Sequence, residues 1–231
     1  MGKRLIPQRR GRGTMLYRSP SHRHVDDVRL PAFNEGTAVI KDLIQAPGRT
    51  CPLAVLDVNG VTDYQLAVEG TKVGQTIQIG GTEIKAGNIT MLSNIPEGTL
   101  INNVEARPGD GGKFAKVAGA SATVVSRGEK VMVLMPSGEI KEFSPNCRAA
   151  IGVVAGGGRG DKPLAKAGKN VHTLRSRSTA PFKTKGVAMN PVDHPHGGGS
   201  HAHVGGPNCQ KRTASPGQKV GFLPPKKKIK K

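Results

Sequence analysis

The stretch CPLAVLDVNGVTDYQLAVEG, residues 51–70, indicates the fold class of the chain. Its two runs CPLAVLDV and DYQLAVE are short and rich in aliphatic and β-branched side chains, and the turn signals VNG and EGT interrupt them. Runs of this kind are typical of strands. The alternation of Tyr64, Leu66 and Val68 predicts that one face of the second strand is buried. The stretch therefore predicts β structure.

Runs of similar composition occur on both sides of this stretch. AVIKDLIQ precedes it and QTIQIG follows it, and a second set of runs comprises NITML, TLINNVEA, ATVVS, KVMVLM, EIKEF and RAAIGVV. Pro136, Ser137 and Gly138 predict a tight hairpin turn between KVMVLM and EIKEF. Strand signals at intervals of about 10–14 residues are typical of small barrels. We therefore predict two small all-β barrels, divided near residues 85–90.

The strand signals stop before GGGRGDKPLAKAGKN. Asp161 as N-cap and Pro163 in the first turn predict one short helix here, which ends at Gly168. GGGRG lacks the Gly-Lys-Ser/Thr ending of a P-loop, which argues against nucleotide hydrolysis. We interpret it as a loop whose backbone and Arg159 approach RNA phosphates, and a flexible loop without that role is the alternative.

Positive charge is concentrated at the two ends of the chain. Of the formal net charge of +19, residues 1–30 contribute +6, residues 31–150 contribute −1 and residues 151–231 contribute +14. Five lysines occur among the last six residues. Such ends repel themselves until a polyanion neutralises them, so RNA or DNA is the expected partner. A membrane is disfavoured, because no apolar run approaches the roughly 18 residues of a spanning helix.

Aromatic residues and cysteines are scarce. With two Tyr, five Phe and no Trp, any core must be small and aliphatic. Tyr64 is the only aromatic residue within 36–88, which argues against a generic single-strand binder that stacks bases on aromatic side chains. Cys51, Cys147 and Cys209 lie far apart and form no CxxC motif, which predicts a reducing compartment.

The most unusual segment is MNPVDHPHGGGSHAHVGG, residues 189–206, which holds four of the seven histidines. Zinc binding is one possibility, although the spacing of the candidate residues matches no zinc finger or zinc knuckle. The candidate metal ligands are His194, His196, His201, His203 and Cys209. Catalysis by Asp193, His194 and Ser200 is a second, although adjacent residues of an extended chain point apart. We favour a loop that packs against RNA. Its glycines allow the backbone to come close to a phosphate or base, and its imidazoles stack on bases. A solvated loop is the remaining alternative.

Several motifs resemble those of one universal family, the second protein of the large ribosomal subunit. They are GKRLIPQRRGRG at 2–13, Leu53–Val58, RAAIGVVAGGGR at 148–159, GRGDKPLAKAGKN at 158–170 and GVAMNPVDHPHGGG at 186–199. The resemblance covers nearly the whole chain and is closest to the archaeal and eukaryotic type. In archaeal-type members the residue corresponding to His196 is often Phe.

The resemblance implies a mainly β fold, with an OB-fold barrel followed by an SH3-like barrel between extended basic arms. On this basis we expect a basic N-terminal arm at residues 1–35 and the OB-fold-like barrel at 36–88. The SH3-like barrel is expected at 89–158, and a basic Gly/His-rich C-terminal extension at 159–231.

The resemblance also implies a structural constituent of the large ribosomal subunit, in the cytoplasm. Such a protein binds 23S-type rRNA and contacts neighbouring ribosomal proteins, and it faces small-subunit rRNA across the subunit interface. It supports subunit association, tRNA binding and the peptidyl transferase region, which the loop corresponding to residues 189–199 approaches. Catalysis is then expected to come from rRNA, with no catalytic residue, metal or cofactor in this chain and no membrane partner.

The residues expected to contact rRNA are basic side chains of both ends and the polar and glycine residues of the His-rich segment. They are Arg9, Arg10, Arg12, Arg159, Lys166, Lys169, Arg175, Arg177, Lys183, Lys185, Asn190, His194, His196, Gly197, Gly198, Gly199, His201, His203, Lys211 and Arg212.

Overall fold

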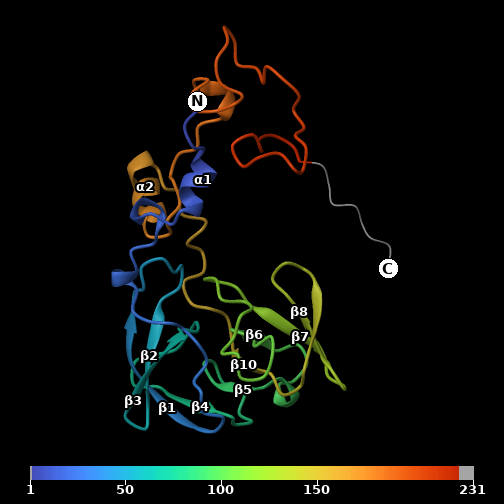
Figure 1. Ribbon diagram of the computed structural model, residues 1–231. Coiled ribbons are helices and arrows are strands. Elements are labelled where there is room, and N and C mark those ends of the chain that lie inside the picture. Colours follow the sequence, from blue (N-terminus) through green and yellow to red (C-terminus); the bar gives the residue numbers. More distant parts are fainter. Residues whose placement is uncertain (1, 224–231) are drawn as a thin grey trace. The chain divides into compact units, whose positions relative to one another are not determined.

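The computed structural model describes residues 2–223 and is mainly β (Figure 1). The chain divides into two compact units. The strand unit comprises His22–Pro163, and the terminal unit comprises Met1–Ser21 together with Leu164–Lys231. The five lysines among the last six residues lie outside the described residues.

Within the described residues the strand unit contains ten strands, and each overlaps one of the ten predicted runs. They are β1 Gly36–Ile44, β2 Leu53–Val58, β3 Val61–Leu66, β4 Thr76–Ile79, β5 Ile89–Met91, β6 Leu100–Asn102, β7 Ala122–Ser126, β8 Val131–Leu134, β9 Ile140–Phe143 and β10 Arg148–Ile151. The prediction of a mainly β chain is confirmed.

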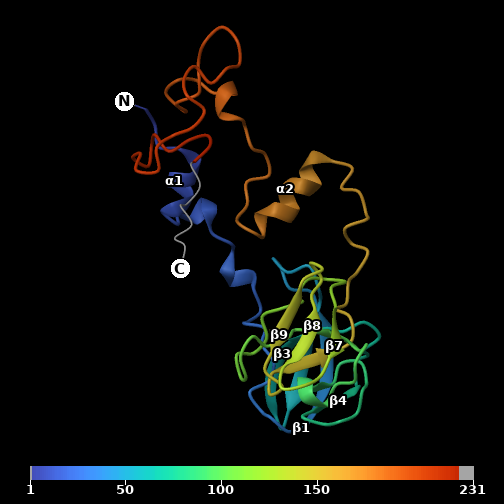
Figure 2. The same cartoon turned by 90° about the vertical axis from the view of Figure 1, so that its right-hand side faces the viewer.

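The strands are linked in the order β3-β2-β1-β4-β5-β10-β6-β7-β8-β9. Neighbours are antiparallel except β4 and β5, which meet in parallel at one residue pair, Ile79 and Ile89. This narrow join separates β1–β4 from β5–β10 and lies beside the predicted boundary near residues 85–90 (Figure 1). In the perpendicular view of Figure 2 the two groups of strands overlap. The OB-fold and SH3-like assignments and the four-part division of the chain stay predictions.

The predicted hairpin turn at Pro136–Gly138 is confirmed. β8 pairs antiparallel with β9, and the N–H of Gly138 donates to the Met135 carbonyl across 2.9 Å. Gly138 has φ +88°, a left-handed conformation that glycine adopts without steric cost.

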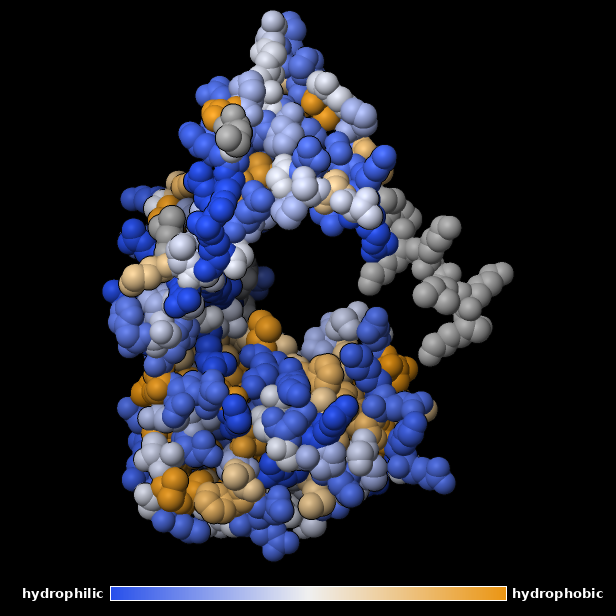
Figure 3. All heavy atoms as spheres, viewed as in Figure 1, coloured by the Kyte–Doolittle hydropathy of each residue, from blue (hydrophilic) through white to orange (hydrophobic). Residues whose placement is uncertain are grey.

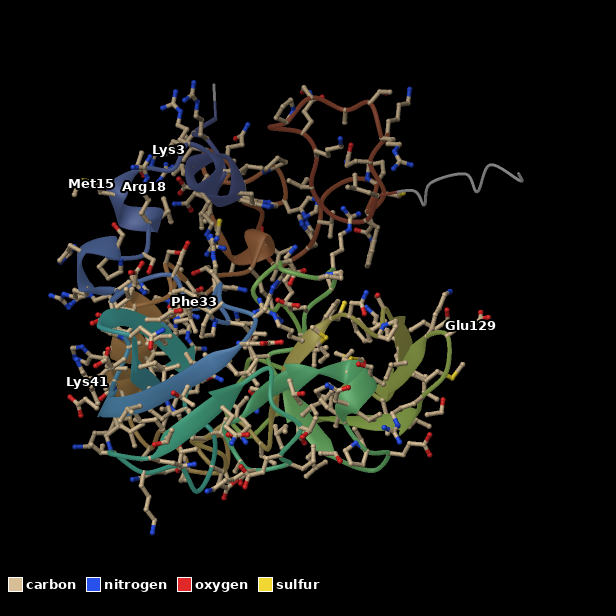
Figure 4. All side chains as sticks on the ribbon, turned by 90° about the horizontal axis from the view of Figure 1, so that it is seen from below. Lys3, Met15, Arg18, Phe33, Lys41 and Glu129 are labelled. Atoms are coloured by element: carbon tan, nitrogen blue, oxygen red, sulfur yellow. The ribbon has the colours of Figure 1, made fainter. Side chains whose placement is uncertain are left out.

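Glu129, in the preceding β7–β8 turn, and Lys41 on β1 point away from the strands (Figure 4).

The cores are small and aliphatic, as predicted. One cluster lies between residues 92 and 149, where Val131 and Val133 of β8 are buried and the intervening Met132 is exposed. A second is built on β1–β4 and includes Ile40, Leu56 and Ile77. Each buried aliphatic side chain of this size contributes about 1.5–3 kcal/mol of transfer free energy. Cys51 and Cys147 are buried free thiols and Cys209 is an exposed one.

The segment before β1 packs onto the strand unit. Val28 and Leu30 are 4% and 3% exposed and belong to its cores. The ammonium group of Lys116 donates to the Val28 carbonyl across 2.9 Å, and burial lowers the Lys116 pKa. Residues from His22 onward thus belong to the strand unit, although the predicted N-terminal arm extended to residue 35.

A buried ion pair fixes this segment further. The Arg148 guanidinium donates to the Glu105 carboxylate through Nη2 at 2.9 Å and Nε at 3.2 Å, and both side chains are almost fully buried. Nη1 donates to the carbonyls of Pro31 and Phe33 at 2.9 and 3.0 Å. The second carboxylate oxygen accepts the Arg148 backbone N–H. Because these groups satisfy one another, the pair avoids the penalty of an isolated buried charge.

Helical segments are few and short. The described residues contain α1 Ile6–Gly11 and α2 Ala167–Arg175, with 3₁₀ turns at Met15–Tyr17, Ser21–Arg23, Leu92–Asn94 and Gly186–Ala188. None of these helices is long and apolar enough to cross a membrane.

The predicted helix from Asp161 to Gly168 is wrong. The Asp161 N–H donates to the Gly158 carbonyl in a turn, so it does not begin a helix. Ala165 has φ +52°, which no right-handed helix tolerates. The helix begins only after Lys166, whose extended backbone precedes α2.

Candidate nucleic-acid interface

The two units differ completely in charge. The terminal unit contains twenty Lys and Arg residues and one acidic residue, Asp193, so it carries +19. The strand unit contains fifteen basic and fifteen acidic residues and is neutral. Side chains of the terminal unit on the face shown in Figure 3 are accordingly mostly hydrophilic. The predicted separation of charge along the sequence therefore coincides with a separation between compact units.

Both ends of the chain contribute to the terminal unit. The Lys3 backbone N–H donates to the Val192 carbonyl across 2.7 Å. The Lys3 ammonium group lies 3.2 Å from Asp193 Oδ1, so the only carboxylate side chain of the unit is already paired. The N-terminal segment, along which Lys3, Met15 and Arg18 lie (Figure 4), thus packs against the His-rich segment almost two hundred residues later in the chain.

Helix α1 is short and presents arginines. Pro7 stands in the first turn, where its missing N–H costs no hydrogen bond, and the Gln8 side chain accepts the Leu5 N–H at 2.8 Å. Arg9 and Arg10 lie in the last turn, where cations interact favourably with the helix dipole.

The arginines of the N-terminal segment converge. A hollow in the terminal unit is lined by Arg4, Arg9 and Arg12 together with Thr14 and Tyr17. The Arg10 guanidinium lies 6.0 Å from the centroid of the Tyr17 ring. Like charges gathered in one concavity repel one another, and an arginine guanidinium fits phosphate with paired hydrogen bonds. The hollow is therefore suited to an anion.

The His-rich segment folds upon itself. The N–H groups of Asp193 and His194 donate to the Asn190 carbonyl, and the N–H groups of Gly197 and Gly198 donate to the His194 and Met189 carbonyls. These bonds close a compact loop from 189 to 198 without regular secondary structure beyond the turn at Gly186–Ala188.

Contacts within the chain explain the glycines of this segment. A Cβ on Gly197 would collide with the Asn190 carbonyl, and one on Gly198 would lie 2.5 Å from Pro191 Cγ. Gly199 has φ +88°, and its Cβ would lie 2.7 Å from the His203 ring. The fold of the loop itself thus requires residues without a side chain at these positions, independently of any RNA that binds there.

His194 and His196 form a defined pair. Their ring centroids are 5.0 Å apart in an edge-to-face arrangement, and the His196 backbone N–H donates to His194 Nδ1 across 3.0 Å. Because Nδ1 accepts this bond, the proton of the neutral ring resides on Nε2. Burial lowers the His194 pKa below its ordinary value of 6.5, and the neighbouring His196 lowers it further. His194 is therefore a neutral hydrogen-bond donor whose only lone pair is already engaged.

The other predicted residues are more widely distributed. Arg159 lies in the strand unit and donates to the Thr50 carbonyl at 3.3 Å. Lys166 precedes α2, Lys169 and Arg175 lie on it, and Arg177 follows it. The remaining basic and histidine positions lie on exposed loop backbone of the terminal unit; they are Lys183, Lys185, His201, His203, Lys211 and Arg212.

Several residues at these surfaces are absent from the predicted set. Arg4 and Tyr17 line the arginine hollow, and Phe182 lines a second hollow of the same unit. Arg4 could have been included from its place among the N-terminal arginines. Phe182 had a signal in its surroundings, because it is an aromatic residue followed at once by the basic residues Lys183 and Lys185 of APFKTK.

The alternative sites considered from the sequence do not assemble in the described residues. No group of three His, Cys, Asp or Glu side chains there lies close enough together to hold a metal ion. Asp193 pairs with Lys3, and His194 receives its hydrogen bond from the backbone of His196. Ser200 is exposed at a bend and is held by neither of them.

Comparisons with known proteins connect the chain to ribosomal proteins. The family described as Ribosomal Proteins L2, C-terminal domain, matches residues 85–217. The large ribosomal subunit protein uL2 of Thermoplasma acidophilum is 50% identical over 230 residues, which cover 99% of this chain and 98% of that protein. The proteins of the same name from Picrophilus torridus and Archaeoglobus fulgidus are 47% and 51% identical, over 100% and 96% of this chain and 99% and 96% of their own lengths.

Proposed function

Because the chain belongs to the uL2 family of large-subunit ribosomal proteins, as an archaeal-type member, we propose that it is a structural constituent of that subunit which binds rRNA through its terminal unit. The resemblance noted in the sequence is confirmed at the level of the family. The chain is then located in the cytoplasmic ribosome.

The distribution of charge is the observation that carries this proposal. The terminal unit holds twenty basic residues against one carboxylate, and that carboxylate is paired with Lys3. A segment pair of this charge is stabilised by a polyanion around it, and each phosphate that it neutralises releases a condensed counterion. The neutral strand unit, in contrast, has the composition of an ordinary small β domain.

The finer role that we propose is positioning. The predicted contact residues of the His-rich loop, Asn190 to Gly199, would orient rRNA near the peptidyl transferase region and so support tRNA binding. Contacts with neighbouring ribosomal proteins and with small-subunit rRNA would support subunit association. His194 is a donor with no free lone pair, which argues against a general base and favours catalysis by rRNA.

The test compares two charge-matched variants of the full chain. One replaces Arg4, Arg9 and Arg12, which share the N-terminal hollow, by Gln. The other replaces Lys72, Lys85 and Arg107, which are exposed on the strand unit, by Gln and so removes the same charge. Binding to large-subunit rRNA is measured from about 50 to 200 mM salt, a range over which phosphate contacts dominate the change in affinity.

The arginine variant is expected to flatten the slope of log K against log salt by about 2–3, at roughly 0.7–0.9 for each phosphate that is no longer neutralised. The strand-unit variant should keep the slope of the unmodified chain. Equal slopes for the two variants would show that general charge, rather than the terminal unit, determines the binding.

A further inference from the structure

A cavity of about 420 Å³ lies within the terminal unit, between the N-terminal segment and two stretches near the C-terminus. Two apolar residues of its lining, Leu5 and Val220, are each 8% exposed. Phe182 forms part of the wall and is 62% exposed. Arg10, Lys183, Lys219 and Asp193 also line it, and Asp193 is paired with Lys3. The cavity thus combines apolar side chains with an excess of cationic ones.

Two polar groups at this cavity present N–H donors. His194 lines it, and its Nε2 carries the proton because Nδ1 accepts the His196 N–H. The Nε of Arg10 is buried and has no hydrogen-bond partner among the described residues. A buried N–H without an acceptor is unfavourable, so an acceptor supplied by a ligand would be favoured there.

Glycine at position 186 allows His194 to occupy its place. A Cβ at Gly186 would collide with the His194 ring, and the backbone of Gly186 does not have a left-handed φ. A small residue is therefore required here for contact with the imidazole and not for backbone conformation. The chain accommodates the histidine at the cavity wall by leaving out one side chain.

We propose that this cavity receives one unstacked nucleobase of the bound RNA. A nucleotide is flat and largely apolar at one end and anionic at the other, which matches an apolar interior beside Arg10 and Lys183. Unpaired bases of RNA are recognised by stacking on aromatic side chains and by hydrogen bonds to their edges. Phe182 would provide the stacking surface, and His194 the donor. This inference rests on the proposed rRNA binding and names its nucleotide-sized subsite.

The experiment probes complexes of the full chain with large-subunit rRNA in two ways. Base-specific reagents report the accessibility of base edges, and hydroxyl radicals report the accessibility of the RNA backbone. The two test variants are Phe182→Ala, which removes the stacking surface, and Gly186→Ala, which displaces His194. Their matched controls are Phe222→Ala, an exposed phenylalanine of the same unit, and Gly206→Ala, a glycine whose Cβ would meet open space.

The unmodified chain and both controls are expected to protect the edge of at least one unpaired base. Both test variants should expose that same base while the hydroxyl-radical pattern stays unchanged. Loss of one stacked base should weaken affinity roughly 5- to 150-fold.

Three outcomes would contradict this expectation in distinguishable ways. Unchanged base protection in both test variants would overturn the nucleobase subsite while leaving rRNA binding intact. Tight Phe182-dependent binding of free AMP, CMP, GMP or UMP would assign the cavity to a mononucleotide instead. Absence of any protection by the unmodified chain would overturn the proposed function itself, and the subsite with it.

Discussion

At the scale of single residues, Glu105 and Arg148 determine how the segment before β1 is held. Arg148 bridges the buried carboxylate of Glu105 and the carbonyls of Pro31 and Phe33. Replacing Arg148 by Met keeps the length and much of the volume of the side chain but leaves Glu105 buried without its partner. We expect a loss of about 3–5 kcal/mol in the free energy of unfolding, because an unpaired buried charge is strongly penalised.

Circular dichroism during urea denaturation of the full chain measures this loss. The matched control is Lys130→Met, which breaks an exposed pair with Glu142 at 2.6 Å. Little change is expected there, since solvent screens exposed pairs. Similar midpoints for the two variants would contradict the assigned role of Arg148.

His194 gives the terminal unit a dependence on pH. Its pKa is lowered in the folded chain, by burial first and by His196 second, so near that pKa the unfolded chain binds more protons than the folded one. Stability therefore rises with pH: its contribution is complete above about pH 6.5 and is lost as the pH falls from there towards the lowered pKa.

An NMR titration of the imidazole protons, together with thermal denaturation between acidic and neutral pH, checks this expectation. His194→Gln should remove this part of the pH dependence, and His201→Gln, at an exposed position, should retain it. A His194 resonance that titrated above about pH 6.5 would rule out the neutral donor described above.

At the scale of elements, the packing of the segment from His22 to Phe33 redefines the stable core. Val28 and Leu30 are buried, and the Leu30 N–H donates to the Gly111 carbonyl across 2.8 Å. Trypsin should therefore cleave after Arg23, in an exposed turn, and spare the bond after Arg29. We expect a resistant fragment that begins at His24, whereas the basic arm predicted from the sequence would have been removed as far as residue 35.

Mass spectrometry of the fragment decides between these starting points. The Arg148→Met variant provides a control, because releasing the carbonyls of Pro31 and Phe33 should make the bond after Arg29 accessible. A fragment of the unmodified chain that begins at Leu30 or Asp42 would mean that the segment is not held as described.

The strands were predictable and the connections between distant segments were not. The run ATVVS coincides with β7, because alternating buried and exposed side chains produce a local pattern in the sequence. The Glu105–Arg148 pair joins residues 43 positions apart, and neither residue has a local signature. The helix at Ala167–Arg175 was misplaced because the left-handed backbone of Ala165 depends on its surroundings and not on the identity of the residue.

The candidate site was predicted only in part, because it too depends on contacts between segments that are distant in the sequence. Arg9, Arg10 and Arg12 were identified from their charge, and the structure places Arg9 and Arg12 around one hollow with Arg4. The cavity at Phe182 was not predicted, since its walls come from three separate stretches of the chain. The glycines of the His-rich loop were attributed to close approach of RNA, but the structure shows that contacts within the loop already require them.

At the scale of the whole molecule, the central feature is that one unit carries the charge and the other carries the core. All of the net charge of +19 resides in residues 1–21 and 164–231, and the ten strands reside in residues 22–163. Separating the two allows a small aliphatic core to fold without the repulsion that a uniformly basic chain would suffer. Binding and stability are then expected to respond to different substitutions.

Hydrogen–deuterium exchange of the full chain, with and without large-subunit rRNA, tests this division most directly. Addition of rRNA is expected to slow exchange at residues 2–21 and 164–223, including the loop from Asn190 to Gly199, and to leave β1–β3 and β7–β9 nearly unchanged. Slower exchange concentrated on those strands, with the terminal unit unaffected, would place the rRNA-binding surface on the neutral unit and contradict the proposed role of the terminal unit.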